Sequence, residues 1–108
     1  MNTGDNQAVG KAIVLVGLMG TGKSSVGAKV ARSIDAQFID TDDLIAQQSG
    51  RSVREIFAQD GEAAFRDAEV AALNKAFETV RLGNDTVIST GGGIVLNPIN
   101  RKLIKENA

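Results

Sequence analysis

The 108-residue sequence predicts an α/β domain built around a parallel sheet. Three short runs rich in apolar and β-branched residues alternate with longer segments of helical spacing. A glycine-rich loop joins the first run directly to the first helical segment. Strands that alternate with helices in this way are typical of parallel sheets with right-handed crossovers.

The predicted strands are residues 12–16, 37–40 and 86–90. The first strand is a continuous apolar run, which is typical of a strand covered on both faces of a sheet. Residues 1–10 are polar and are expected to form a flexible N-terminal tail. We therefore assign residues 11–108 to one domain.

The helical segments carry start signals that the sequence makes visible. Asp42 is expected to cap the second helix, Ser52 and Glu55 fit a capping box for the third, and the Asn-Pro pair at 97–98 suits the start of the last. One apolar face of the first helix is marked by residues four positions apart, Val26, Val30 and Ile34. The expected helices are 23–34, 43–49, 53–60, 62–81 and 98–107.

Composition narrows the classes of function. The 12 Lys and Arg against 13 Asp and Glu give a net charge of −1, so neither nucleic acid nor an anionic membrane is an expected partner. The sequence has no Cys and no His, which excludes thiolate and imidazole metal ligands and His-based catalysis. It shows neither a signal-peptide pattern nor an apolar run of membrane-spanning length, so we expect a cytoplasmic protein.

Residues 17–24 match the pattern G-x-x-x-x-G-K-[ST] of a phosphate-binding loop at every fixed position. The loop glycines let successive N–H groups turn towards phosphate oxygens, and the helix that begins here adds its positive end. Lys23 would reach the β- and γ-phosphates, and Ser24 would be a Mg²⁺ ligand. The sequence thus predicts a three-layer fold of the P-loop NTPase type. Its predicted nucleotide-binding residues are Gly20, Thr21, Gly22, Lys23, Ser24 and Ser25.

Acidic residues follow the second predicted strand rather than the third. Many P-loop enzymes end the third strand in an acid, whereas residues 89–91 here are Ser-Thr-Gly. Asp40 and Asp42 lie at the end of the second strand, at the edge where open α/β sheets bind ligands. Capping of the next helix is an alternative role for both. The further sequence marks of a signalling GTPase are absent.

Four segments together resemble the shikimate kinase family in order and spacing. They are the phosphate loop, the D-x-D segment at 40–42, the G-E-x-x-F-R-x-x-E segment at 61–69 and the T-G-G-G segment at 90–93. The resemblance runs from about residue 11 to residue 107. It implies ATP as phosphate donor, Mg²⁺, the 3-hydroxyl of shikimate as acceptor, and a role in aromatic amino acid biosynthesis. It also implies a sheet with strand order 2-3-1-4-5.

The resemblance further implies how the acceptor is held. Asp42 would bind shikimate hydroxyls, and Arg66 would bind the carboxylate while Glu69 braces it from one helical turn away. A planar guanidinium suits a carboxylate, and an acceptor-only carboxylate suits hydroxyl groups. A solvated surface pair is the simpler alternative for Arg66 and Glu69. Backbone N–H groups would approach the ring at Gly91, Gly92 and Gly93, although this glycine run could also be a chain reversal.

The implied catalytic residues are Lys23, Asp42 and Asp40. Asp40 would act near Mg²⁺ through water, while Ser24 would bind the ion directly. Independently of the resemblance, three aromatic residues are expected in the core, namely Phe57, Phe65 and Phe77.

The family continues past the point where this sequence stops, with another strand, a mobile lid and an adenine-contacting loop. We therefore expect a partial sequence of a longer, monomeric enzyme. In the implied strand order the strand 12–16 is central, and without the later strands it becomes an exposed apolar edge. Two other hypotheses remain open. One is another P-loop small-molecule kinase, such as a gluconate kinase. The other is a non-catalytic nucleotide-binding module that completes its sheet with a partner.

Overall fold

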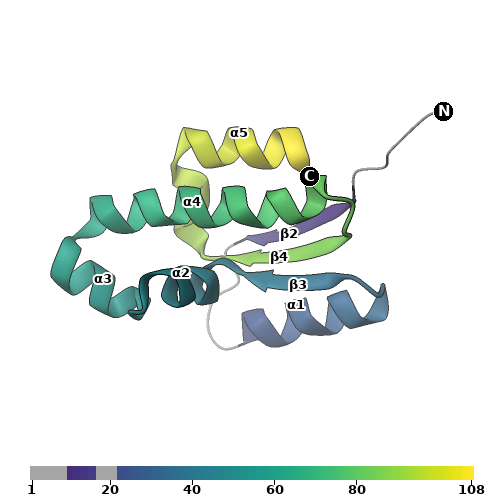
Figure 1. The fold of residues 1–108 in the computed structure, drawn as a ribbon, viewed down its shortest axis with the longest axis horizontal. Coiled ribbons are helices and arrows are strands. Elements are labelled where there is room, and N and C mark those ends of the chain that lie inside the picture. Colours follow the sequence, from purple (N-terminus) through teal and green to yellow (C-terminus); the bar gives the residue numbers. More distant parts are fainter. Residues whose placement is uncertain (1–9, 17–21) are drawn as a thin grey trace.

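The computed structural model describes residues 10–16 and 22–108, and for residues 22–25 and Gly92 it describes the backbone alone. The tail predicted for 1–10 lies outside the described residues except for Gly10, whose N–H donates to the Val80 carbonyl (2.8 Å). The elements are β2 (Ala12–Val16), α1 (Gly22–Ser33), β3 (Gln37–Asp40), α2 (Thr41–Ser49), α3 (Val53–Asp60), α4 (Glu62–Arg81), β4 (Thr86–Thr90), the 3₁₀ helix η1 (Gly92–Leu96) and α5 (Pro98–Asn107). The predicted α/β class is confirmed (Figure 1).

The described strands form a parallel sheet in the order β2-β4-β3. In chain order β2, β3 and β4 are the first, second and third predicted strands. Their arrangement is therefore 2-3-1 when read from β3, which agrees with the first three positions of the order that the resemblance implied. Every residue of the central strand β4 is buried. In the register, Val16 pairs with Thr90 and Asp40 pairs with Ser89. Because the strands are parallel, the carboxyl ends of all three therefore lie at one edge of the sheet.

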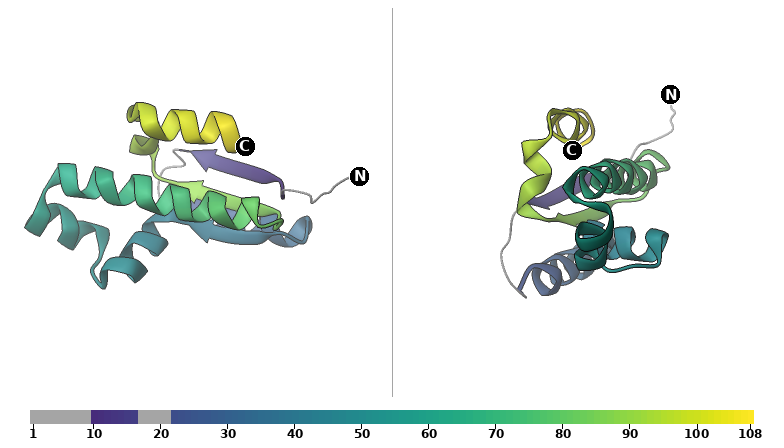
Figure 2. Two further views of the ribbon diagram at one scale, coloured as in Figure 1. Left: turned by 45° about the horizontal axis from the view of Figure 1, so that its top comes forward. Right: turned by 90° about the vertical axis from the view of Figure 1, so that its left-hand side faces the viewer.

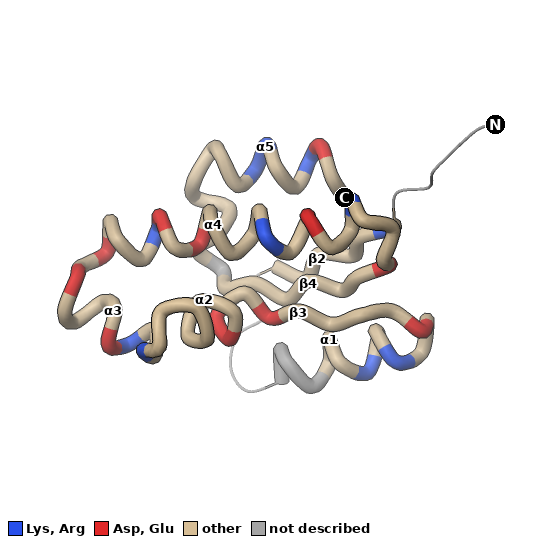
Figure 3. The backbone as a smooth tube through the Cα atoms, in the orientation of Figure 1, with Lys and Arg blue, Asp and Glu red and all other residues tan. Residues whose placement is uncertain are grey.

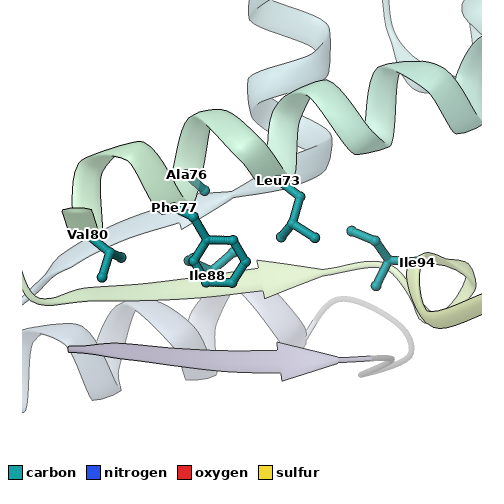
Figure 4. Close-up of a cluster of buried hydrophobic side chains, with 6 residues drawn as sticks. All are labelled: Leu73, Ala76, Phe77, Val80, Ile88 and Ile94. Carbon is teal, nitrogen blue, oxygen red and sulfur yellow. The ribbon is translucent and has the colours of Figure 1, made fainter. Parts of the chain in front are cut away.

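Helices cover both faces of this sheet, with α4 and α5 on one side and α1 on the other (Figures 1 and 2). The main core lies between α4 and β4, where Phe77 and Ile88 are fully buried. Figure 4 shows the α4 side chains directed onto β4. The buried cluster consists of Leu73, Ala76, Phe77, Val80, Ile88 and Ile94.

A second buried cluster joins α2 and α3 to the first half of α4. It consists of Ile45, Ile56, Phe65 and Ala72. Phe57 was expected in the core but is 39% exposed, with its ring centroid 4.6 Å from that of Phe65. Its ring thus packs against Phe65 but stays partly open to solvent.

The helix starts are largely as predicted, with one correction. Ser52 and Glu55 form the predicted capping box, and Asn97 caps α5 through its side chain. Asp42 was the expected cap of α2, but the cap is Asp40, for which capping had been given as an alternative role. Strand β3 runs into α2 without a loop, so Asp40 occupies the N-cap position and its Oδ1 accepts hydrogen bonds from the Asp42 and Asp43 N–H groups (2.9 and 3.1 Å).

The outer strand β2 and helix α1 bury less apolar surface than their sequences suggest. Within the described sheet, β2 pairs on one side only, and its Ile13 and Val16 are exposed. The expected face of α1 is also partly open, since Val26 and Ile34 are exposed. The buried face lies one position along, at Gly27 and Ala31, because these small residues allow the helix to approach the sheet closely.

Both signs of charge are interspersed along α4 and α5 (Figure 3). Among residues 10–16 and 22–108, none of the helices combines the length and the apolar character needed to cross a bilayer.

The contact between α1 and the sheet gives a stability prediction. A Cβ on Gly27 would lie 2.3 Å from Cε1 of Phe38. We expect Gly27→Ala to lower the free energy of unfolding by about 1 kcal/mol, because the overpacking cost, about 2 kcal/mol at the middle of its range, outweighs the helix-propensity gain of about 1 kcal/mol. Urea unfolding of the two proteins measures this difference.

The control is the same substitution in a Phe38→Ala background. There the clash is removed and the propensity gain remains, so Gly27→Ala should stabilise the protein. If Gly27→Ala changed stability equally in both backgrounds, the close packing of Gly27 on Phe38 would be wrong.

Candidate active site

In the sequence, the predicted phosphate loop follows β2, which ends at the carboxyl edge of the sheet, and leads into α1. Residues 17–21 lie outside the described residues, and so do the side chains of Lys23, Ser24 and Ser25. The described backbone shows Gly22 at the first position of α1. The unpaired N–H groups and positive dipole end of a 12-residue helix therefore face this edge, which is the arrangement that binds anions.

Asp40 and Ser89 lie side by side on neighbouring strands, on the face of the sheet that α1 covers. They are register partners, and alternation along β3 puts the Asp40 side chain on the same face as that of Phe38, which contacts α1 at Gly27. Both residues are buried. Among the described residues, Ser89 Oγ has no hydrogen-bond partner. A buried hydroxyl without a partner is uncommon and indicates a site for a polar ligand or water.

Within the described part of the chain, no three acidic side chains converge as a ready-made metal site. The Asp40 carboxylate and the Ser89 hydroxyl are oxygen groups of the kind that suits Mg²⁺ and its water ligands, and both lie near the carboxyl ends of their strands. The sequence drew attention to Ser89 only because many P-loop enzymes have an acidic residue at the end of this strand.

Arg66, in the second turn of α4, is held by two carboxylates. Its Nη1 donates to Glu69 Oε1 at 2.8 Å, and its Nη2 donates to Glu62 Oε2 at 3.2 Å. The Glu69 side chain is 2% exposed, so the alternative of a solvated surface pair is wrong. The hydrogen bond to Glu69 raises the pKa of the Arg66 guanidinium above its usual value, and burial opposes this only in part. Arg66 therefore stays charged.

The glycine segment after β4 lies against this guanidinium. A Cβ on Gly93 would be 2.6 Å from Arg66 Nη1 and 3.1 Å from Nη2, so only glycine fits there without a shift. The segments 61–69 and 90–93, which the family resemblance assigned to the same ligand, thus meet at the carboxyl edge. On its other side the Arg66 Cζ atom lies 5.4 Å from the centroid of the Phe65 ring.

Asp42 lies in the first turn of α2 and is partly buried. Its helix packs on the first half of α4 through the cluster that contains Ile45 and Phe65. Three residues predicted to bind the phosphate-accepting substrate are Asp42, Arg66 and Gly93. They therefore lie on segments that contact one another, with α2 packed on α4 and Gly93 close to Arg66. Sequence analysis missed Glu62 as a partner of Arg66, although its position one helical turn earlier could have indicated it.

The chain is similar to known shikimate kinases. A family model described as "Shikimate kinase" matches residues 19–108. A shikimate kinase of Caldanaerobacter subterraneus subsp. tengcongensis is 53% identical over 97 residues, which cover 90% of this chain and 54% of that protein. A shikimate kinase of Pelotomaculum thermopropionicum is 48% identical over 97 residues, with the same two coverages.

Solved structures show the same likeness. The shikimate kinase of Acinetobacter baumannii, solved in complex with shikimate, superposes with a TM-score of 0.82 at 33% identity. The match covers 92% of this chain and 53% of that structure. The chain spans about half the length of the curated relatives it matches. Because the family model matches most of its residues, the chain belongs to the shikimate kinase family.

Proposed function

We propose that this chain contributes the nucleotide-phosphate site and the shikimate site of a shikimate kinase. The reaction would transfer the γ-phosphate of ATP to the 3-hydroxyl of shikimate. The observation that carries this proposal is the Arg66 guanidinium, fixed by the buried Glu69 and pressed against Gly93 at the carboxyl edge of the sheet. That arrangement suits the binding of a small carboxylate next to a phosphate-binding helix end.

Arg66 would bind the carboxylate of shikimate. A guanidinium that is already oriented by a buried partner loses little conformational freedom when a second carboxylate docks on it. Asp42 would accept hydrogen bonds from ring hydroxyls, which fixes the face of the ring that meets the phosphate. The backbone N–H groups of Gly91, Gly92 and Gly93 would add donors where the glycines allow close approach.

The donor nucleotide would bind at the start of α1. Lys23 would neutralise charge on the β- and γ-phosphates, and Ser24 would bind Mg²⁺. The ion, when bound, would offset the negative charge of the transferred group. Asp40 would orient its water ligands, with the Ser89 hydroxyl beside it. The phosphates would be held by Gly20, Thr21, Gly22, Lys23, Ser24 and Ser25.

Phosphoryl transfer needs alignment and charge neutralisation more than covalent help from the protein. Asp42 would hold the 3-hydroxyl in line with the γ-phosphate and take its proton as the new P–O bond forms. Lys23, Asp42 and Asp40 are therefore the proposed catalytic residues.

The direct test mixes the protein with MgATP and either shikimate or gluconate, and follows ADP and the phosphorylated product by mass spectrometry. Shikimate 3-phosphate formed in equal amount to ADP supports the proposal. Product from gluconate alone would favour the other small-molecule kinase. Bound nucleotide without turnover would favour the non-catalytic module.

We expect Lys23→Ala to reduce ATP turnover by at least 100-fold, because the charge on the β- and γ-phosphates is then left without its nearest cation (about 3 kcal/mol or more). Circular dichroism should show an unchanged fold. Near-normal turnover in a folded variant would show that Lys23 is not part of the site.

We expect Arg66→Ala to raise the KM for shikimate by about 10- to 100-fold while the KM for ATP changes little, because a charged hydrogen-bonding partner of the ligand is lost (about 1.5–3 kcal/mol). The matched control is Lys75→Ala, which breaks the exposed Lys75–Glu78 pair on the same helix (3.0 Å). That variant should leave both constants unchanged.

Gly93→Ala tests the approach of the glycine segment to the guanidinium. The added methyl group would displace the Arg66 side chain, so shikimate affinity should fall by about tenfold, equivalent to about 1.4 kcal/mol. Leu96→Ala is the control, since Leu96 belongs to the same 3₁₀ helix and its side chain is 72% exposed. Equal effects of the two substitutions on the calorimetric Kd would contradict the proposed contact.

A further inference from the structure

The two carboxylates on Arg66 differ sharply in environment. The side chain of Glu69 is 2% exposed, whereas that of Glu62 is 67% exposed. Exposed ion pairs contribute little free energy because water competes for both partners. Separating the buried Glu69 from Arg66 would instead leave a charge without compensation in the protein interior. An anion that arrives at Arg66 therefore displaces Glu62 far more easily than Glu69.

The surroundings of the guanidinium restrict where a ligand can dock. Nη1 donates to the buried Glu69, and it is also the nitrogen nearer to Gly93: a Cβ built there would lie 2.6 Å from Nη1 and 3.1 Å from Nη2. The Phe65 ring lies 5.4 Å from Cζ. The Arg66 side chain keeps 27% exposure, and its solvent-exposed partner is Glu62, on Nη2. Nη2 is thus the nitrogen at which an exchange of carboxylates costs least.

We propose that Glu62 is a built-in competitor of the ligand carboxylate: it occupies Arg66 Nη2 in the free protein and is replaced there when an acidic ligand binds. This inference rests on the proposed function, because it takes Arg66 to be the group that binds the carboxylate of shikimate. Glu62 acts as a specificity-determining residue, not as a catalytic one.

The exchange selects for a particular class of ligand. A ligand with a carboxylate regains at Nη2 the ion pair that Glu62 gives up, whereas a neutral analogue gains nothing by displacing Glu62. Glu62 also adds negative charge next to the site, so an anion that makes only one weak contact is repelled. Because Glu62 competes for Arg66, the affinity for shikimate is lower than it would be if Arg66 were paired with Glu69 alone.

The test is Glu62→Gln, with the Kd for shikimate measured by isothermal titration calorimetry. Loss of the competing charge should lower the Kd by about two- to fivefold, the range expected for an exposed ion pair. The neutral methyl ester of shikimate, a weaker ligand, should show no such gain. The matched control is Glu78→Gln, at an exposed glutamate paired with Lys75 on the same helix, and it should leave both Kd values unchanged.

Glu62 lies in the first turn of α4, where a negative charge favours the helix, so thermal unfolding of Glu62→Gln is recorded alongside. A small loss of stability together with tighter shikimate binding agrees with the inference, since a purely structural role would not tighten binding. A Kd that is unchanged or raised would overturn it.

The Arg66→Ala variant separates this inference from the proposed function. Suppose that Arg66→Ala weakens shikimate binding while Glu62→Gln fails to strengthen it. Glu62 would then not be a competitor, but Arg66 would still be supported as the group that binds the carboxylate. If Arg66→Ala leaves the Kd for shikimate unchanged, the proposed carboxylate site falls and the competitor role falls with it.

Discussion

The parallel register of β4 with its two neighbours is the constraint on which the rest of the structure depends. It aligns Val16, Asp40 and Thr90 at one edge, so α1, α2 and η1 each follow a strand that ends at this edge. Burial of the whole central strand fixes that register, because a shift by one residue would turn Ile88 away from the α4 core and bring Ser89 into it. The candidate site is a consequence of how the sheet is paired.

The buried Glu69 holds the Arg66 side chain in place near this edge. A carboxylate that is 2% exposed is costly to bury unless it is paired, and its partner Arg66 is the residue that the glycine segment approaches. The ion pair therefore fixes the guanidinium before any ligand arrives. Since hydrophobic residues of similar size would often be at least as stable, we attribute this pair to orientation of Arg66 rather than to stability.

Much of the fold could be predicted from the sequence because its signals are local. Apolar spacing and the capping residues Ser52 and Asn97 located the helices to within a residue or two. The errors arose where tertiary contacts decide, as at α1, where close packing of Gly27 on Phe38 sets the buried face. The approach of Gly93 to Arg66 has no local signal at all, so only the family resemblance placed these residues in one site.

The central claim is that Arg66 and the glycine segment form one carboxylate-binding site, and NMR titration with shikimate tests it most directly. Spectra of the arginine side chains and the backbone amides would be recorded as shikimate is added. The account predicts that the Arg66 guanidinium signal and the amide signals of residues 91–93 change together and saturate at one common concentration. An Arg66 signal that stays unchanged at saturating shikimate, or changes confined to other elements, would contradict it.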